Sequence, residues 1–418
     1  MNIKSIKGMN DVLEPEIFAW RHAETLIRMH FEAYGYTEIK TPIVEPTALF
    51  ARTVGDTTDI VTKEMYTFKD RNDDSLTLRP EETACVVRSL VEHNILNNEP
   101  VQKLYYWGPM FRYERPQKGR YRQFHQYGIE VLGIASPKID AELIGMLVSL
   151  YEKFELKGLN VKLASLGCEA CRPVYREQLV KILTPSINVL CPDCQIRLEK
   201  NPLRVFDCKN PTCKEVAAVL PCMLDFLCQP CHEHFDSVRD HLVRLKTPFV
   251  VDKRLVRGID YYNRTVFEIS SSQLGAQDAV GGGGRYDKLV SLLGGPDTPA
   301  VGFAGGVERL ILLIADRIEQ FRPKLKLFIV LPDDRGQDLA FVLAQKLRNS
   351  GVRVELDYTG KSMKSQMKRA DKLKAQYSLI MGGSEIDQGF AVFRNMATKT
   401  QENIKLDDLE IELLRRLS

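Results

Sequence analysis

Apolar residues near the start of the chain recur at helical spacing, at Ile17, Trp20, Ile27, Phe31 and Tyr34. Asp11 with Glu14 resembles a helix start, Pro15 suits a first turn, and Gly35 ends the pattern. These features predict one helix, which we expect to pack against the domain that follows. The next segment, YTEIKTPIVEP (residues 36–46), is typical of an extended strand bounded by prolines.

The central part of the chain alternates between strand-like blocks and insertions. Residues 60–134 are strand-like with loops, a helical stripe follows Asp140, and further strands are predicted at 159–167 and through 255–270. Strands that run in blocks, without regular alternation with helices, favour an antiparallel sheet in an α+β domain. This predicts one large domain over residues 1–320, interrupted by a Cys-rich insertion at 167–245.

The pattern changes after residue 324. LKLFIVLP, VRVELDY and YSLIMGG are typical of buried strands, with helical stretches near 337–350 and 362–375 between them. We therefore predict a compact α/β domain over residues 324–418.

Composition narrows the class of protein. A chain of 418 residues with 44% hydrophobic and 27% charged residues is typical of a globular protein of several domains. No signal-peptide pattern and no apolar run long enough to span a membrane is found, so we expect a cytoplasmic protein without membrane contact. Because the net charge is only +3, any polyanion must be bound by local basic patches.

One such patch is FRYERPQKGRYRQFHQYGIE, residues 111–130. If its second half is a strand, Gln126, Gly128 and Glu130 share one face and form a small polar recess. Arg112 lies at the other end of the basic loop, where its guanidinium group suits a phosphate or carboxylate. A solvent-facing polar strand with a basic loop is the alternative.

A second candidate is LTLRPEETACVVRSLVEH (residues 76–93), where Arg79, Glu81 and Thr83 alternate. In an extended chain Glu81 and Thr83 would face one side and could hold an ammonium group. The alternative, which the sequence favours, is a helix that begins with Pro80 and early acidic residues and needs no ligand.

Three further stretches carry candidate binding residues. The first contains Arg257, Tyr261 and Tyr262, which lie around a predicted strand. The alternative is an edge strand whose tyrosines are partly exposed. Four consecutive glycines at 281–284 suggest close approach by a ligand or another backbone. Arg309 lies near the start of a predicted helix, where the positive end of the helix dipole disfavours a cation unless an anion binds beside it. The alternative is an exposed arginine that binds nothing.

The cysteines are concentrated in the insertion. Four pairs lie at metal-ligand spacing, Cys168/Cys171, Cys191/Cys194, Cys208/Cys213 and Cys228/Cys231. The first two pairs match the spacing of a zinc ribbon. The last two pairs could form another tetrahedral site, in which Cys222 or His232 could replace one of the cysteines. Two structural Zn²⁺ ions are expected, although the pairing stays open. Reduced cysteines packed as small apolar residues are the alternative.

Taken together, these motifs resemble the class II aminoacyl-tRNA synthetases, specifically the histidyl-tRNA synthetases of bacterial type. YTEIKTPIVEP resembles the first class motif at a dimer interface, residues 111–130 the second, and GFAGGVERL the third. LVRGIDYYNRTVFEI and GGGGRYD resemble the signatures of the histidyl family, and the C-terminal part resembles its anticodon-binding domain. The resemblance implies a homodimer that joins L-histidine to tRNA(His) with ATP.

Carried onto this sequence, the resemblance implies a set of site residues. The histidine site would comprise Glu81, Glu82, Thr83, Arg112, Gln126, Glu130, Arg257, Tyr261 and Tyr262, with the ammonium group near Glu81, Thr83 and Gln126. The imidazole would meet Glu130 and Tyr262. Arg112 and Arg309 would hold the phosphates of Mg²⁺-bound ATP, and Arg257 with Arg112 would stabilise charge during the reaction.

The resemblance also implies where tRNA binds. Arg115 and Gln117 would contact the acceptor end. In the C-terminal domain a basic helix with Lys361, Lys364, Lys368, Arg369 and Lys372 would contact the anticodon arm, or is simply solvated.

Two other classes of function remain as alternatives. The first is a synthetase-like regulatory subunit of ATP phosphoribosyltransferase, but such proteins lack the tRNA-binding tail and usually lose parts of these motifs. The second is a nucleic-acid-binding module without catalysis, which would leave the polar strand face and the glycine run unexplained.

Overall fold

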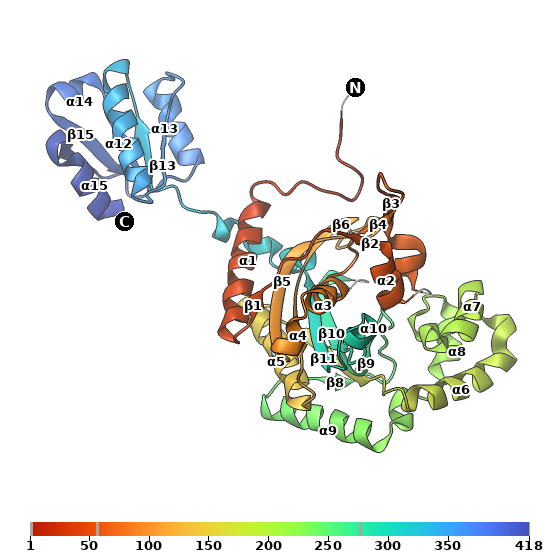
Figure 1. The fold of residues 1–418 in the computed structure, drawn as a ribbon. Coiled ribbons are helices and arrows are strands. Elements are labelled where there is room, and N and C mark those ends of the chain that lie inside the picture. Colours follow the sequence, from red (N-terminus) through yellow and green to blue (C-terminus); the bar gives the residue numbers. More distant parts are fainter. Residues whose placement is uncertain (1–2, 56–57, 276–277, 418) are drawn as a thin grey trace. The chain divides into compact units, whose positions relative to one another are not determined.

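A computed structural model describes residues 3–55, 58–275 and 278–417 (Figure 1). The chain forms two compact units, Met1–Phe321 and Arg322–Ser418. Each unit has its own hydrophobic core.

The first unit is built on an eight-stranded sheet. Its strand order is β1 (Thr37–Glu38), β5 (Gln102–Phe111), β6 (Gln123–Leu132), β11 (Ala300–Gly306), β10 (Ala279–Arg285), β9 (Asn263–Ser271), β7 (Leu159–Ser165) and β8 (Val250–Val251). The six central strands pair antiparallel, and only the short edge strands β1 and β8 pair parallel. The predicted α+β class with an antiparallel sheet is confirmed.

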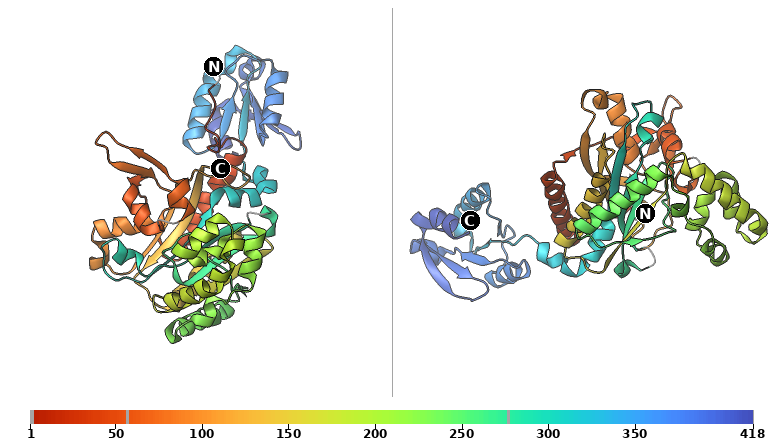
Figure 2. Two further views of the ribbon diagram at one scale, coloured as in Figure 1. Left: turned by 90° about the vertical axis from the view of Figure 1, so that its right-hand side faces the viewer. Right: turned by 90° about the horizontal axis from the view of Figure 1, so that it is seen from below.

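The two faces of this sheet are covered differently. On one face the apolar core includes residues of α1 (Glu16–Ala33), α5 (Pro137–Lys153), α9 (Gln229–Arg244) and α11 (Val307–Leu313). Figures 1 and 2 show α5 and α9 side by side across the strands. The other face carries α3 (Thr83–Glu92), α4 (Ile95–Asn98) and α10 (Leu289–Leu292), which contribute to a smaller core. The helix predicted before Gly35 is therefore confirmed as α1, and it packs on the sheet.

The segment 36–46 differs from its prediction as one strand. It contains β1, which pairs with the large sheet, and β2 (Val44–Pro46), which belongs to a three-stranded sheet with β4 (Ser75–Leu78) and β3 (Tyr66–Lys69). The chain changes sheets between the two strands, near Pro42. The helix α2 (Thr47–Val54) follows β2 directly.

The cysteine-rich insertion is helical. It contains α6 (Cys171–Leu183), α7 (Pro192–Lys200) and α8 (Pro211–Ala218), joined by single 3₁₀ segments, of which η3 (Pro202–Asp207) matters below. Tyr175, Leu179 and Leu198 are buried together with five of the cysteines, so the insertion has a core of its own. The insertion then leads into α9, which returns to the sheet.

The second unit is an α/β domain with a five-stranded sheet. The order is β13 (Val354–Leu356), β12 (Leu327–Val330), β14 (Tyr377–Ile380), β15 (Phe390–Asn395) and β16 (Gln401–Lys405). The three predicted strands and the helices α12 (Gln337–Asn349) and α13 (Met363–Lys372) are confirmed, while α14 (Gly383–Asp387), α15 (Leu409–Leu417) and the β15–β16 hairpin were not predicted. In β16 only Ile404 is buried, so this strand lacks the apolar–polar alternation that indicates a strand in the sequence. Among the described residues, no helix is long and apolar enough to cross a membrane.

Candidate active site

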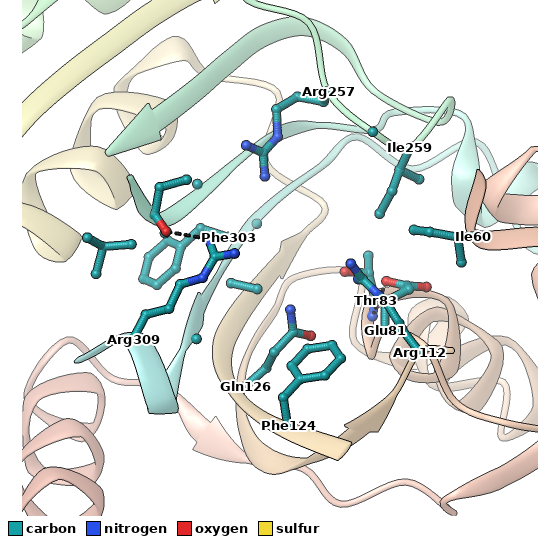
Figure 3. Close-up of a pocket in the computed structure, with 18 of the residues that line it drawn as sticks. Ile60, Glu81, Thr83, Arg112, Phe124, Gln126, Arg257, Ile259, Phe303 and Arg309 are labelled. Atoms are coloured by element: carbon teal, nitrogen blue, oxygen red, sulfur yellow. Dashed lines mark hydrogen bonds between the residues drawn. The ribbon is translucent and has the colours of Figure 1, made fainter. Parts of the chain in front are cut away.

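A cavity opens on the less covered face of the large sheet. Its walls come from β6, β10, β11, the start of α3, the start of α11 and the loop before β9. Figure 3 shows Arg257 and Arg309 on one side of this cavity, facing Arg112, Glu81 and Thr83 on the other.

Glu81 and Thr83 lie at the start of α3. The Glu81 carboxylate accepts the backbone N–H groups of Thr83 and Ala84, each at 2.9 Å. The predicted helix is present but begins at Thr83, not at Pro80, so Glu81 lies just before it and Thr83 is not extended. The Glu81 carboxylate satisfies N–H groups that the first helical turn leaves unpaired. Both side chains nevertheless line the cavity. Burial raises the pKa of the Glu81 carboxyl, although its backbone hydrogen bonds oppose that rise.

The predicted polar face of β6 is confirmed. Tyr127 and Ile129 point into the helix-covered core, so Gln126 and Glu130 lie on the cavity side. Gln126 lines the cavity, and its buried Oε1 has no hydrogen-bond partner among the described residues. This side chain therefore offers a free acceptor.

Glu130 lies beneath the cavity wall and is only 1% exposed. The Thr83 hydroxyl donates to its Oε1 at 2.7 Å, and the Tyr286 hydroxyl donates to its Oε2. Burial raises the pKa of Glu130 to about 8, because the hydrogen bonds from these hydroxyls only partly offset the loss of solvent. Gly302 makes room for it, since a Cβ there would lie 1.9 Å from Oε2.

Arg257, Tyr261 and Tyr262 lie in the loop before β9. The edge-strand alternative is wrong, because β9 begins at Asn263 and pairs with both β7 and β10. Tyr261 donates to the Glu81 carboxylate at 3.4 Å and packs against Tyr262, with ring centroids 4.7 Å apart. Arg257 donates to Glu268 at 3.1 Å.

The glycine run is the central strand β10. A Cβ at Gly283 would lie 2.0 Å from the Gly302 carbonyl oxygen, and one at Gly282 would lie 2.7 Å from the Phe267 carbonyl oxygen and 3.0 Å from Nη1 of Arg257. The predicted close approach by another backbone is therefore confirmed. Gly282 also lines the cavity, where a side chain would displace Arg257.

Four arginines line the cavity, namely Arg112, Arg120, Arg257 and Arg309. Arg309 donates to the carbonyl oxygens of Gly119 at 3.0 Å and Ala279 at 2.5 Å. Burial lowers the pKa of Arg309, and the nearby Arg120 guanidinium adds to this effect. Arg309 is half-buried, so the exposed alternative is wrong. Arg120 pairs with Glu114 at 2.8 Å and Arg257 with Glu268 at 3.1 Å, whereas the acceptors of Arg309 among the described residues are carbonyl oxygens. A half-buried cation without a carboxylate partner favours a bound anion.

Some candidate residues lie outside the cavity wall. Glu82 points elsewhere, toward Arg79 at 2.8 Å and the Thr41 hydroxyl at 2.6 Å, and burial raises its pKa to about 7. Arg115 and Gln117 are exposed in the loop between β5 and β6.

Tyr286, Arg120, Glu114 and Glu308 also line the cavity, and the sequence patterns did not indicate them as site residues. Tyr286 lines the cavity and bonds to Glu130, and Arg120 completes the arginine group. The motif GGGGRYD contains Tyr286, and the basic loop contains Arg120, but neither pattern indicates which side chain faces a ligand.

The eight paired cysteines form two groups. Cys168 and Cys171 meet Cys228 and Cys231, whereas Cys191 and Cys194 meet Cys208 and Cys213. The ribbon combination of the first four cysteines is therefore wrong. Cys222 lies outside both groups and donates to Asp225 at 3.0 Å.

The basic residues of the second unit lie on and just before α13. Gln366 and Ala370 form the buried side of this helix, and the basic side chains at 361, 364, 368, 369 and 372 are exposed. Arg369 forms a 3.2 Å ion pair with Asp357.

An antiparallel sheet with an arginine-lined cavity on its open face, followed by a separate α/β domain, defines a class II aminoacyl-tRNA synthetase. Sequence comparison names the family. The histidyl-tRNA synthetase family model matches residues 8–169 and 225–310, and an anticodon-binding domain model matches 326–416. The chain belongs to the histidyl-tRNA synthetase family.

Individual relatives agree over the full length. Histidine–tRNA ligase of Geobacter sulfurreducens is 50% identical over 409 residues, which cover 98% of both chains. Histidine–tRNA ligase of Syntrophotalea carbinolica is 47% identical and covers 100% of this chain and 99% of its own. The crystal structure of apo histidyl-tRNA synthetase from S. aureus has a TM-score of 0.83 at 38% identity, covering 98% of this chain and 99% of that one.

Proposed function

We propose that this protein is a histidine–tRNA ligase, which activates L-histidine with ATP and transfers it to tRNA(His). One observation carries the proposal: a single cavity combines acceptors for an ammonium group with four arginines. The first set suits an amino acid and the second a triphosphate. An enzyme that joins the two needs both in one place.

The amino group of histidine would be held by three acceptors. The Glu81 carboxylate supplies the negative charge, and the Thr83 hydroxyl and the free Gln126 Oε1 supply neutral oxygens. They come from two different elements that meet at the cavity, so the ammonium position is defined in three dimensions.

The imidazole would be recognised by Glu130 and Tyr262. Glu130 is reached from the cavity only when the Thr83 or Tyr286 hydroxyl exchanges its bond to the carboxylate for one to the ligand. Because its pKa is about 8, Glu130 is largely protonated near neutral pH before histidine arrives. In that form its O–H can donate a hydrogen bond to an imidazole nitrogen. A polar pocket of this kind rejects ligands without a matching hydrogen-bonding group.

The arginines would carry the charge of the phosphates. In the proposed reaction a carboxylate oxygen of histidine attacks the α-phosphorus, the bond to the bridging oxygen breaks, and pyrophosphate leaves. Arg112 and Arg257 would stabilise the charge that develops on the α-phosphate, while Arg309 would hold the γ-phosphate. No nucleophile or base from the protein is required, because positioning and electrostatics lower the barrier.

Mg²⁺ would accompany ATP. Glu114 and Glu308 line the cavity near the arginines, and carboxylate oxygens are the ligands that this ion prefers. The ion would neutralise part of the phosphate charge.

The adenylate would then react with the terminal ribose of tRNA(His). The exposed Arg115 and Gln117 belong to the loop that also contributes Gly119 and Arg120 to the cavity wall, so they can contact the acceptor end. The exposed basic face of α13 suits the anticodon arm.

We also propose a cytoplasmic homodimer. Ile43 and Val44 lie in the segment expected at the dimer interface, and they are 42% and 39% exposed. Apolar side chains of this kind are buried when a second subunit covers them.

The regulatory-subunit alternative is not favoured. The cavity retains all four arginines, and the second unit matches an anticodon-binding domain. A protein that only senses histidine needs neither feature.

The test is ATP–pyrophosphate exchange with each amino acid in turn, followed by charging of a tRNA(His) transcript. We expect exchange with histidine alone and charging of the transcript. The variant Glu81→Gln keeps the helix cap but loses the charge that attracts the ammonium group, and should raise the KM for histidine. Histidine binding without exchange would refute the ligase and favour the regulatory subunit.

A further inference from the structure

The helical insertion holds eight cysteines in two compact groups. In each group the four Sγ atoms all lie within 4.8 Å of one another. Sγ of Cys168 lies 3.6 Å from that of Cys171 and 3.7 Å from that of Cys228, and the Cys191–Cys208 distance is 3.7 Å. These distances are far longer than a disulfide bond. They match the edge of a tetrahedron around zinc, roughly 3.8 Å for a Zn–S bond of about 2.3 Å.

Local structure brings the four sulfurs of each group together. Each pair lies at the start of a helix: Cys171 begins α6, and Cys194, Cys213 and Cys231 occupy the first turns of α7, α8 and α9. The sulfurs also accept backbone N–H groups across the pairs, from Cys228 to Cys171 at 3.1 Å and from Cys191 to Cys213 at 3.3 Å.

We propose that the insertion binds two structural Zn²⁺ ions, one in each group of four cysteines. Four thiolates in tetrahedral array suit zinc and leave no open coordination position, so neither ion takes part in catalysis. The alternative of reduced cysteines packed as apolar residues does not explain why eight sulfurs converge into two sets of four. The histidyl-tRNA synthetase family model leaves residues 170–224 unmatched, so this arrangement does not follow from family membership.

The two ions would have different structural roles. The first joins the entrance of the insertion, at Cys168, to its exit at Cys228, which lies 60 residues later. A metal that closes so long a segment removes much of its freedom in the unfolded state. The second lies within the insertion, where Cys194 and Cys208 flank the short segment η3.

The segment η3 leads to the active site. Arg204 donates to Oδ1 of Asp260 at 2.8 and 3.2 Å, and Asn201 donates to the same oxygen at 3.1 Å. Asp260 belongs to the cavity loop with Arg257 and Tyr262, and its backbone N–H donates to Val54 at 3.2 Å. We infer that the second zinc orders η3 and thereby positions this loop. The functional part of this inference rests on the proposed ligase activity, but the metal sites do not.

The metal content tests the first part. Full-length protein purified without chelator should contain two zinc ions per chain by plasma mass spectrometry. Replacing two ligands of one group, with Cys228→Ser and Cys231→Ser or with Cys208→Ser and Cys213→Ser, should remove one ion in each case. The control Cys222→Ser should keep both.

Cobalt substitution of the wild-type protein makes the test independent of how the variants fold. Two cobalt ions per chain with the intense absorption of tetrahedral thiolate coordination would support the sites. A folded protein that contains no zinc, or that contains iron in place of zinc, would overturn the proposal. If the wild-type protein contains a single zinc ion per chain, the proposal fails for the group of cysteines whose replacement leaves the zinc content unchanged.

Hydrogen exchange tests the second part without relying on activity. We expect amide hydrogen exchange in residues 257–262 to be about tenfold faster or more in Arg204→Gln and in the Cys208/Cys213 double variant. Arg204→Lys should show an intermediate rate, and Cys222→Ser should exchange at the wild-type rate. Unchanged exchange in the two disruptive variants would overturn the positioning role. In the exchange reaction with pyrophosphate, Arg204→Gln should raise the KM for histidine more than it lowers kcat. The two ideas can fail separately. If the wild-type protein shows no histidine-dependent ATP–pyrophosphate exchange but the variants change amide hydrogen exchange as expected, the ligase is refuted and the positioning role stands.

Discussion

The buried Glu130 predicts an unusual dependence of stability on pH. Its pKa rises from an ordinary value of 4.5 to about 8 on folding, chiefly because of burial. A carboxyl whose pKa is higher in the folded chain binds its proton more tightly there. Stability is therefore unaffected below about 4.5, falls as the pH rises from 4.5 to 8, and stays low above that window. Each pKa unit corresponds to about 1.4 kcal/mol, so the single group accounts for roughly 5 kcal/mol at most.

The variant Glu130→Gln isolates this effect. Glutamine has the shape of the protonated acid, its oxygen can accept from Thr83, and its amide can donate to the Tyr286 hydroxyl. Wild type and variant should melt within about 1 °C of each other at pH 5. At pH 9 the catalytic unit of the variant should melt about 5 °C higher or more, since it no longer ionises in a buried site.

Differential scanning calorimetry from pH 5 to 9 measures the difference. The control is Glu177→Gln, because Glu177 is an exposed residue of α6. Parallel melting curves for wild type and Glu130→Gln across this range would refute the reasoning. The variant is also expected to lose at least about 100-fold in kcat/KM for histidine with the KM for ATP retained, because a glutamine reproduces neither the acidic O–H nor the carboxylate that Glu130 can offer to the imidazole. A gain in stability with a loss of activity would identify Glu130 as a functional residue.

Three further predictions follow from the cavity and the sheet. Gly283→Ala should lower the melting temperature by several degrees, since its Cβ would lie 2.0 Å from the Gly302 carbonyl, while Gly258→Ala, with no neighbour within 4 Å, should not. Gln126→Ala should raise the KM for histidine about tenfold and leave that for ATP unchanged, because it removes one neutral acceptor. Arg309→Gln should raise the KM for ATP about 100-fold while histidine binding measured by calorimetry is retained, because it removes a half-buried cation from the proposed phosphate site. Equal changes for both substrates would contradict the last two assignments.

The sequence by itself determined the class of the fold and which side chains of β6 share the cavity face. The β6 pattern placed Gln126 and Glu130 on one face, because side chains alternate along any strand. The glycine run predicted close backbone approach for a similar local reason. The order of the motifs indicated the family, which the full-length relatives confirm.

Only the tertiary structure decided which distant residues meet. Thr83 and Tyr286, which bond to Glu130, lie 47 and 156 positions away from it, and no local pattern predicts those contacts or the raised pKa that burial causes. The cysteine spacings were evident in the sequence, yet Cys168 meets a partner 60 residues away and passes over the nearer pair at Cys191. Local spacing determines which side chains can bind a ligand. The packing of helices and strands determines which of them share one.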